Sequence, residues 1–192
     1  QTNEALATAK SGLDALNNKK SGPAPRLQLQ VFLAELACDQ NDGRLALKEL
    51  DKLDAGQLKS SDANVQAKAA IARGRALLIG KRPAEAALCF DNAAAFYQKA
   101  QRFLDMAIAL QQAGVAYESA DKRQEAFNRH YRAARSFFIC GENIRAEESF
   151  NKANELAKES GDKQMVSALS RLKTETGPDA ENKTAPEKVQ TE

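Results

Sequence analysis

Small side chains recur in this chain at intervals of forty residues. The first recurring position holds Ala34, Gly74, Gly114 and then Asn154. The second, twelve residues later, holds Ala46, Ala86, Ala126 and then Val166. The distance between two packed helices depends on the side chains at their contact, so we expect these small residues to mark close helix crossings. A glycine inside a helix costs about 1 kcal/mol relative to alanine, and close packing would offset that cost.

Larger apolar residues recur in step with the small ones. Three residues after the first position stand Ala37, Leu77, Tyr117 and Ala157. Four residues after the second stand Leu50, Phe90 and His130, followed three residues later by Leu53, Ala93 and Ala133. Units of this kind bury their apolar faces only against neighbouring units. The pattern therefore predicts an all-α solenoid of antiparallel helix pairs.

The composition favours the same fold class. Alanine is abundant and tryptophan is absent, and alanine is the best helix former, whereas strands prefer β-branched and aromatic residues. The breaks in the sequence divide it into about nine helices, at 3–18, 26–40, 43–54, 63–79, 83–100, 103–119, 122–139, 142–159 and 162–174. A generic alanine-rich helical bundle, in which the spacing is a coincidence, is the alternative.

Glycine, proline and aspartate indicate where these helices end and begin. Glycines that we expect at positive φ in the turns are Gly43, Gly80, Gly141 and Gly161. Asp62 and Asp121 are expected to cap the amino-termini of the helices that follow them. Pro83 suits a first helical turn, where a missing N–H costs nothing, whereas Pro23 and Pro25 fall in a break.

Three segments follow from these breaks. Residues 1–25 are expected to form an amino-terminal helix and a linker, and residues 26–175 the repeat domain. Residues 176–192 are polar and contain two prolines. Such a segment buries too little apolar surface to offset the entropy of ordering it. We therefore expect a flexible, disordered C-terminal tail.

The spacing resembles the tetratricopeptide repeat. That family places a small residue, an apolar one at +3, a small one at +12, a bulky one at +16 and a small one at +19. The clearest unit here reads Gly74, Leu77, Ala86, Phe90 and Ala93, and the resemblance covers roughly residues 26–174. The chain departs from the family in its period, which is usually 34, and lacks the proline after the second helix. The resemblance implies a superhelix whose concave groove binds a protein or peptide.

The same resemblance implies which residues line that groove, because the family uses the first helix of each pair. The partner-binding positions carried over are Val31, Glu35, Lys68, Ile71, Arg75, Leu78, Gln111, Val115, Glu118, Asn151 and Glu155, with Cys38, Ile108 and Lys158 beside them. They mix aliphatic side chains with both signs of charge. A solvated helix face has a similar mixture. The family's Lys/Asn/Arg clamp for a peptide carboxylate is not present, so chaperone-tail binding is not predicted.

The sequence carries no pattern typical of catalysis. His130 is the only histidine, and it occupies a position held elsewhere by Leu50 and Phe90, so a packed or partly exposed helix histidine is expected rather than a catalytic base. No cluster has the spacing of zinc ligands, and no glycine-rich phosphate loop follows a strand. We expect no enzyme activity, no cofactor and no metal.

Charge and hydropathy limit the partners. A net charge of +2, from 28 basic and 26 acidic residues spread along the chain, gives no electrostatic reason to expect nucleic acid. The apolar runs are far shorter than the roughly 20 residues of a transmembrane helix. The polar start at Gln1 fits a linker after a processed signal or a lipid anchor upstream of Gln1, and equally a trimmed chain. A periplasmic or membrane-anchored lipoprotein is therefore favoured, with the cytoplasm as the alternative.

The cysteines favour the cytoplasm instead. Cys38, Cys89 and Cys140 are odd in number and form no CxxC pair, which does not suit a secreted disulfide framework. We expect three small thiols packed between helices. The chain is therefore interpreted as a non-enzymatic scaffold or adaptor, assisting assembly of a bacterial envelope or secretion complex. A cytoplasmic chaperone or a structural subunit of a stable complex is the alternative.

Overall fold

The computed structural model describes residues 2–18 and 22–176. The described residues form ten helices and no strand. The helices are α1 (Thr2–Asn18), α2 (Pro23–Asp39), α3 (Gly43–Asp51), α4 (Ala55–Ser60), α5 (Ala63–Ile79), α6 (Pro83–Lys99), α7 (Phe103–Ser119), α8 (Arg123–Ile139), α9 (Asn143–Ser160) and α10 (Lys163–Thr176). The predicted tail, apart from Thr176, lies outside the described residues.

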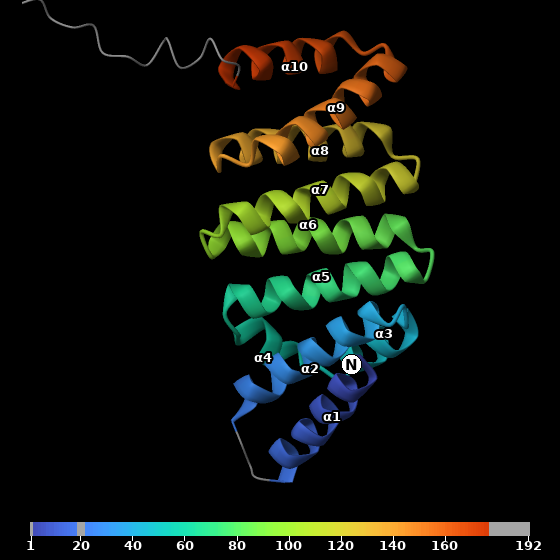
Figure 1. The fold of residues 1–192 in the computed structure, drawn as a ribbon, viewed down its shortest axis with the longest axis vertical. Helices are drawn as coiled ribbons and strands as arrows, with labels where there is room; N and C mark the ends of the chain where they lie inside the picture. The colour runs from blue at the N-terminus through green and yellow to red at the C-terminus, as the bar shows by residue number, and fades with distance from the viewer. Residues whose placement is uncertain (1, 19–21, 177–192) are drawn as a thin grey trace, which may run out of the picture.

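The helices stack one upon another along the long axis of the molecule, with α1 and α10 at opposite ends (Figure 1). From α6 to α9, each helix packs chiefly on the helices before and after it in the chain, whereas α5 packs on α2 and α3 as well as on α6. Three-residue turns join these helices, so successive helices run antiparallel. The predicted all-α solenoid of helix pairs is confirmed. The tenth helix is the short α4, which lies between residues 54 and 63, where the sequence analysis expected no helix.

The repeat is more regular than the forty-residue pattern indicated. Outside α1 and α4, helices begin at residues 23, 43, 63, 83, 103, 123, 143 and 163. Each helix together with the turn that follows it therefore takes up half of the forty-residue period, and successive helices begin twenty residues apart. The helices α5 to α8 each span seventeen residues and are joined by three-residue turns, which accounts for the twenty-residue spacing.

The turns obey the same twenty-residue spacing. Residues with positive φ follow the helices at Asn41, Lys81, Gln101, Asp121, Gly141 and Gly161. In five of these turns the next residue donates its N–H to a carbonyl five positions back, as Arg82 does to Leu77 at 2.8 Å. This is the Schellman arrangement that ends a helix. The expected positive φ is confirmed for Gly141 and Gly161.

Three of the turn predictions are wrong, because Gly80 and Gly43 do not take positive φ and Asp121 is not an N-cap. Gly80 has φ −75°, and the next residue, Lys81, takes the positive φ instead. Asp121 also adopts positive φ and caps nothing, so Lys122 is the N-cap of α8. Gly43 opens α3 and is needed for close approach, because a Cβ there would lie 2.6 Å from the Ala76 carbonyl oxygen.

Helix starts follow the capping chemistry more closely. Asp62 accepts hydrogen bonds from the N–H groups of Asn64 and Val65, as predicted. Pro83 stands in the first turn of α6, also as predicted. The break at Pro23 is placed differently, since α2 begins at that proline rather than at residue 26. A proline tolerates the first helical position because its N–H would be unpaired there.

The small residues do lie at helix crossings. A Cβ on Gly74 would come within 2.7 Å of the Phe90 ring, and one on Gly114 within 2.6 Å of the His130 ring. Each glycine of α5 or α7 thus faces the bulky residue sixteen positions later in the partner helix. Ala46, Ala86 and Ala126 are fully buried, whereas Val166 is 47% exposed, so the pattern ends before α10.

A polar cluster links α6, α7 and α8 beside this apolar core. Arg129 donates two hydrogen bonds to the Asp91 carboxylate, at 2.6 and 2.8 Å. Tyr117 donates its hydroxyl proton to the same carboxylate at 2.8 Å. Burial and the Asp91 hydrogen bond raise the pKa of Tyr117 to about 12. The carboxylate therefore fixes the register of three successive helices.

Candidate partner-binding face

The predicted groove residues all lie on the first helices of the four pairs, α2, α5, α7 and α9. We call the exposed side of these helices the first-helix face. The predicted residues on it do not form one continuous pocket. Seven of them line two separate depressions, one between α2 and α5 and one between α7 and α9.

The depression between α2 and α5 has a volume of about 290 Å³. Its walls are formed by Gln28, Val31, Phe32, Glu35, Asp62, Asn64, Val65 and Lys68. Val31, Glu35 and Lys68 belong to the predicted set. The sequence analysis missed Phe32, which is 45% exposed and is the largest apolar side chain of this depression. An aromatic residue next to a buried valine on the same helix was the available signal.

The depression between α7 and α9 has a volume of about 380 Å³. Its walls are formed by Gln111, Val115, His130, Glu148, Asn151, Lys152 and Glu155. Gln111, Val115, Asn151 and Glu155 belong to the predicted set. Val115 is 49% exposed and supplies an apolar side chain among polar neighbours. His130 reaches this depression from α8, a second helix, which spacing along the first helices did not reveal.

The remaining predicted residues, Ile71, Arg75, Leu78 and Glu118, line neither depression. Ile71 is partly buried and packs against the core. Leu78 is exposed on α5. Arg75 and Glu118 are held by side chains within the protein, through Asp39 and His130 respectively.

Charges of both signs lie in and beside the depression between α2 and α5. Arg75 donates a hydrogen bond to the Asp39 carboxylate at 2.6 Å. Burial raises the pKa of Glu35, and the positive charges of Lys68 and Arg75 partly oppose that shift. The half-buried Glu35 thus lies among two cations of α5, and this pairing joins the first and second pairs across the face.

A histidine–carboxylate pair supports the depression between α7 and α9. His130 is 1% exposed, and its Nε2 lies 2.6 Å from Oε1 of Glu118. Burial lowers the pKa of His130, while the Glu118 hydrogen bond acts in the opposite direction. A neutral imidazole donates from Nε2 to the carboxylate, and its buried Nδ1 has no hydrogen-bond partner in the described part of the chain. The prediction of a packed histidine is confirmed.

The cysteines differ from one another in their surroundings. Cys38 is buried and its thiol lies 3.5 Å from the Ala72 carbonyl oxygen, whereas Cys89 is half-buried. Cys140 is exposed in the turn between α8 and α9, so the prediction of three packed thiols is wrong for this residue. Its place in a turn, next to Gly141, removes it from the helix contacts. All three thiols are free.

Two searches of the described residues bear on the kind of site present. Residues 2–18 and 22–176 contain no group of three or more His, Cys, Asp or Glu side chains placed to hold a metal ion. No helix within the same residues has the length and apolar character needed to cross a membrane.

No model of a known protein family matches the sequence, and no curated protein or solved structure matches it either.

Proposed function

We propose that this protein is a non-enzymatic scaffold that binds a partner protein on its first-helix face. The observation that carries the proposal is the placement of exposed apolar side chains, Phe32 and Val115, inside depressions whose other lining residues are mostly charged and polar. An apolar centre with a polar rim is typical of protein-binding surfaces. The resemblance to tetratricopeptide repeats supports the same face, because that family binds partners with its first helices.

The setting that we propose is assembly of a bacterial envelope or secretion complex. It rests on the resemblance to the family. A cytoplasmic chaperone or a permanently assembled structural subunit is the second candidate, favoured by the free thiols. The second candidate predicts a complex of fixed stoichiometry that survives native size-exclusion chromatography. An adaptor would instead exchange its partner in competition with added purified chain.

The experiment is an affinity capture from the native extract with a matched pair of variants. Val115→Glu introduces a charge on the first-helix face, and Leu88→Glu introduces the same charge on α6 at a residue of similar exposure, 56%. Loss of a partner identified by mass spectrometry with Val115→Glu, and its retention with Leu88→Glu, would support the face. Equal capture by both variants, each with unchanged helicity by circular dichroism, would refute it.

A further inference from the structure

A cavity lies where the repeat is interrupted. The helix α3 ends at Asp51, whereas the equivalent helices α6 and α8 continue to Lys99 and Ile139. The short helix α4 crosses the vacated space and buries none of its own residues. Forty residues before Phe96 and Tyr97 stand Gly56 and Gln57, both exposed. The aromatic side chains that fill this position in the next unit are thus missing here.

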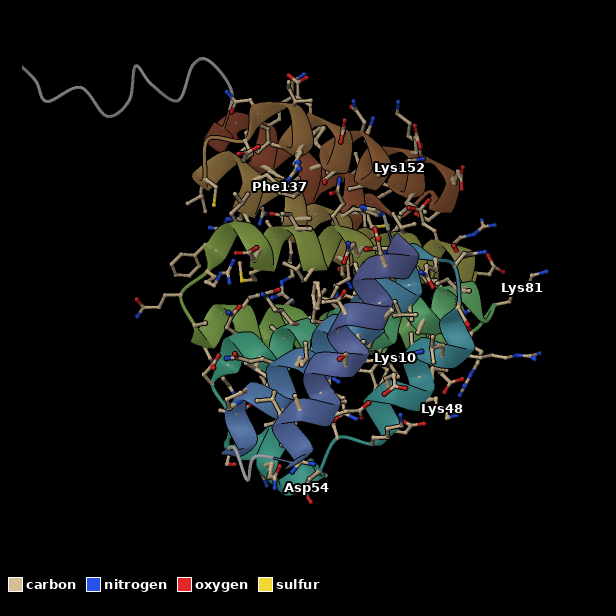
Figure 2. All side chains as sticks on the ribbon, turned by 60° about the horizontal axis from the view of Figure 1, so that its bottom comes forward. Lys10, Lys48, Asp54, Lys81, Phe137 and Lys152 are labelled. Carbon is tan, nitrogen blue, oxygen red and sulfur yellow. The ribbon has the colours of Figure 1, made fainter. Side chains whose placement is uncertain are left out.

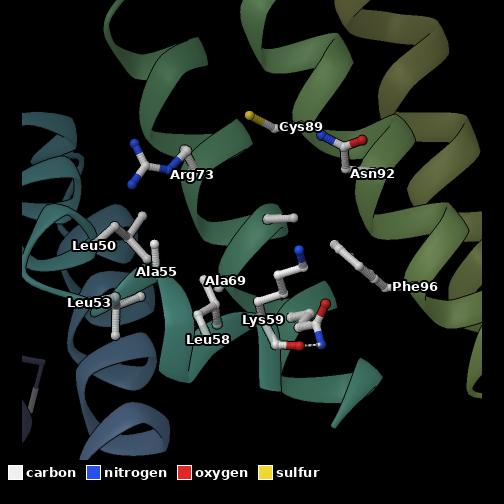
Figure 3. A pocket seen from close by; sticks show the side chains of 12 residues that line it. Leu50, Leu53, Ala55, Leu58, Lys59, Ala69, Arg73, Cys89, Asn92 and Phe96 are labelled. Atoms are coloured by element: carbon white, nitrogen blue, oxygen red, sulfur yellow. Dashed lines mark hydrogen bonds between the residues drawn. The ribbon is translucent and has the colours of Figure 1, made fainter. Parts of the chain in front are cut away.

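The resulting cavity has a volume of about 310 Å³ and lies between α3, α4, α5 and α6 (Figure 3). Its walls are largely apolar and include Leu50, Leu53, Leu58, Ala69, Ala70 and Phe96. This volume is within the range of small-molecule sites, which begins at roughly 300 Å³. Water is held poorly by a space with so few polar partners, so an apolar occupant would gain free energy by entering it.

The mouth of the cavity carries one uncommitted positive charge. Lys59 lines it from α4, and the amino end of its side chain points across the opening between Ala69 and Phe96 (Figure 3). Within the described residues, no hydrogen bond or ion pair is recorded for this ammonium group. The other cation of the lining, Arg73, donates to the Asp51 carboxylate at 2.8 Å. An ammonium beside an apolar cavity favours a ligand that has both an anionic and an apolar part.

The remaining polar residues of the lining add no competing negative charge. Burial raises the pKa of Cys89, so its thiol is neutral near pH 7. The Gln66 side chain donates to the main-chain carbonyls of Lys59 and Ser61, at 3.2 and 2.7 Å. These bonds hold the main chain at the end of α4 against α5, so the point from which the Lys59 side chain extends is set by the fold.

We propose that this cavity binds a single-chain amphipathic carboxylate, with the hydrocarbon chain among the leucines of α3 and α4 and the carboxylate at Lys59. The site lies away from the first-helix face and does not depend on the function proposed above. A single chain is specified because the cavity has room for one narrow apolar body and one cation at its mouth.

The test is isothermal titration of the full chain with decanoate and with decanol, below the concentrations at which either aggregates. Decanoate is expected to bind saturably at one site per chain, about fivefold more tightly than decanol, since an exposed charge contact contributes up to about that factor. Lys59→Gln should remove this preference and leave the affinity for decanol unchanged. Lys163→Gln, an exposed lysine at the start of α10, is the matched control and should retain it.

Two further variants test the cavity itself. Ala70→Phe should fill the space and weaken both ligands at least tenfold, whereas Ala95→Phe, on an exposed position of α6, should weaken neither. Leu58→Gln changes a wall on α4, which buries no residue, and serves if Ala70→Phe does not fold. The proposal is overturned by unsaturable decanoate binding, by unchanged binding in both wall variants, or by a decanoate preference that survives Lys59→Gln.

Discussion

The glycine of α5 gives the sharpest test of the packing argument. Gly74 lies in the middle of a helix, where replacement of an ordinary glycine by alanine stabilises by about 1 kcal/mol. At Gly74 the added Cβ would meet three atoms of the Phe90 ring at 2.7 to 2.9 Å. Phe90 is almost fully buried, so the ring has no free space to move into. Forcing such overlap costs about 1–3 kcal/mol.

The expected result for Gly74→Ala is therefore a net destabilisation of about 1 kcal/mol, because the steric cost exceeds the gain in helix propensity. The same change in a Phe90→Ala background should have the opposite sign. Phe90→Ala alone costs about 3–5 kcal/mol, and with the ring gone the alanine at 74 should recover about 1 kcal/mol. The reversal is a coupling energy of about 2 kcal/mol between two residues in contact.

Urea unfolding followed by far-ultraviolet circular dichroism measures all four proteins of this cycle. The chain contains no tryptophan, so the helical signal at 222 nm is the suitable probe. Gly74→Ala that stabilises the otherwise unchanged chain by about 1 kcal/mol, as at an open helical site, would refute the reasoning. The small residues would then recur for some cause other than close helix crossings.

Three other changes have expected outcomes. Gly80→Ala should stabilise by about 0.5 to 1 kcal/mol in the same urea assay, because φ is −75° and a Cβ meets only ordinary contacts; a loss of stability would contradict the turn geometry. Lys81→Gly should raise the melting temperature, since positive φ costs a non-glycine residue about 1 kcal/mol and Lys81 points away from the ribbon (Figure 2); an unchanged or lower temperature counts against it. Because burial lowers the pKa of His130, the unfolded state binds its proton first as the pH falls below about 6.5, and stability should decline by up to about 1.4 kcal/mol per pH unit until the folded-state pKa is reached. His130→Phe should flatten that decline in urea titrations between pH 7 and 5, and an unaltered slope would exclude His130 as its source.

The repeat and the helix class could be predicted from the sequence because they depend on local and periodic signals. The small residues were expected to mark helix crossings, and the structure places Gly74 and Gly114 at such crossings, against the rings of Phe90 and His130. Asp62 and Pro83 were recognised because capping chemistry is local. These features need no knowledge of the neighbouring unit.

The residues with positive φ in the turns were harder to predict, since their positions are set by the geometry of the turn and not by the type of side chain. Lys81, Gln101 and Asp121 take positive φ because the chain must reverse there, whatever side chain is present. The sequence contained a better signal than glycine, namely the twenty-residue spacing of the turns themselves. It becomes visible only when the two helices of a pair are recognised as having equal length.

The candidate face was predicted in part. The choice of helices came from the resemblance to the family, whereas the depressions depend on how side chains of α2 and α5, and of α7, α8 and α9, come together in space. His130 joins one of them from a second helix, and a list of first-helix positions does not contain it. The cavity beside α4 arises from a missing segment of helix. The exposed Asp54, which accepts from the N–H of Gln57, was the local sign that a new helix begins there.

The packing of α6 to α9 on their chain neighbours also determines how the molecule unfolds. Because helices distant in the chain make few contacts with one another, one part of the stack can unfold while the other helices stay folded. Unfolding should begin at α10 or α1, each of which is packed on one side only, and proceed inward one helix after another. Unfolding of a terminal helix should therefore leave the central helices folded, and a partner bound to α5 to α9 would remain bound.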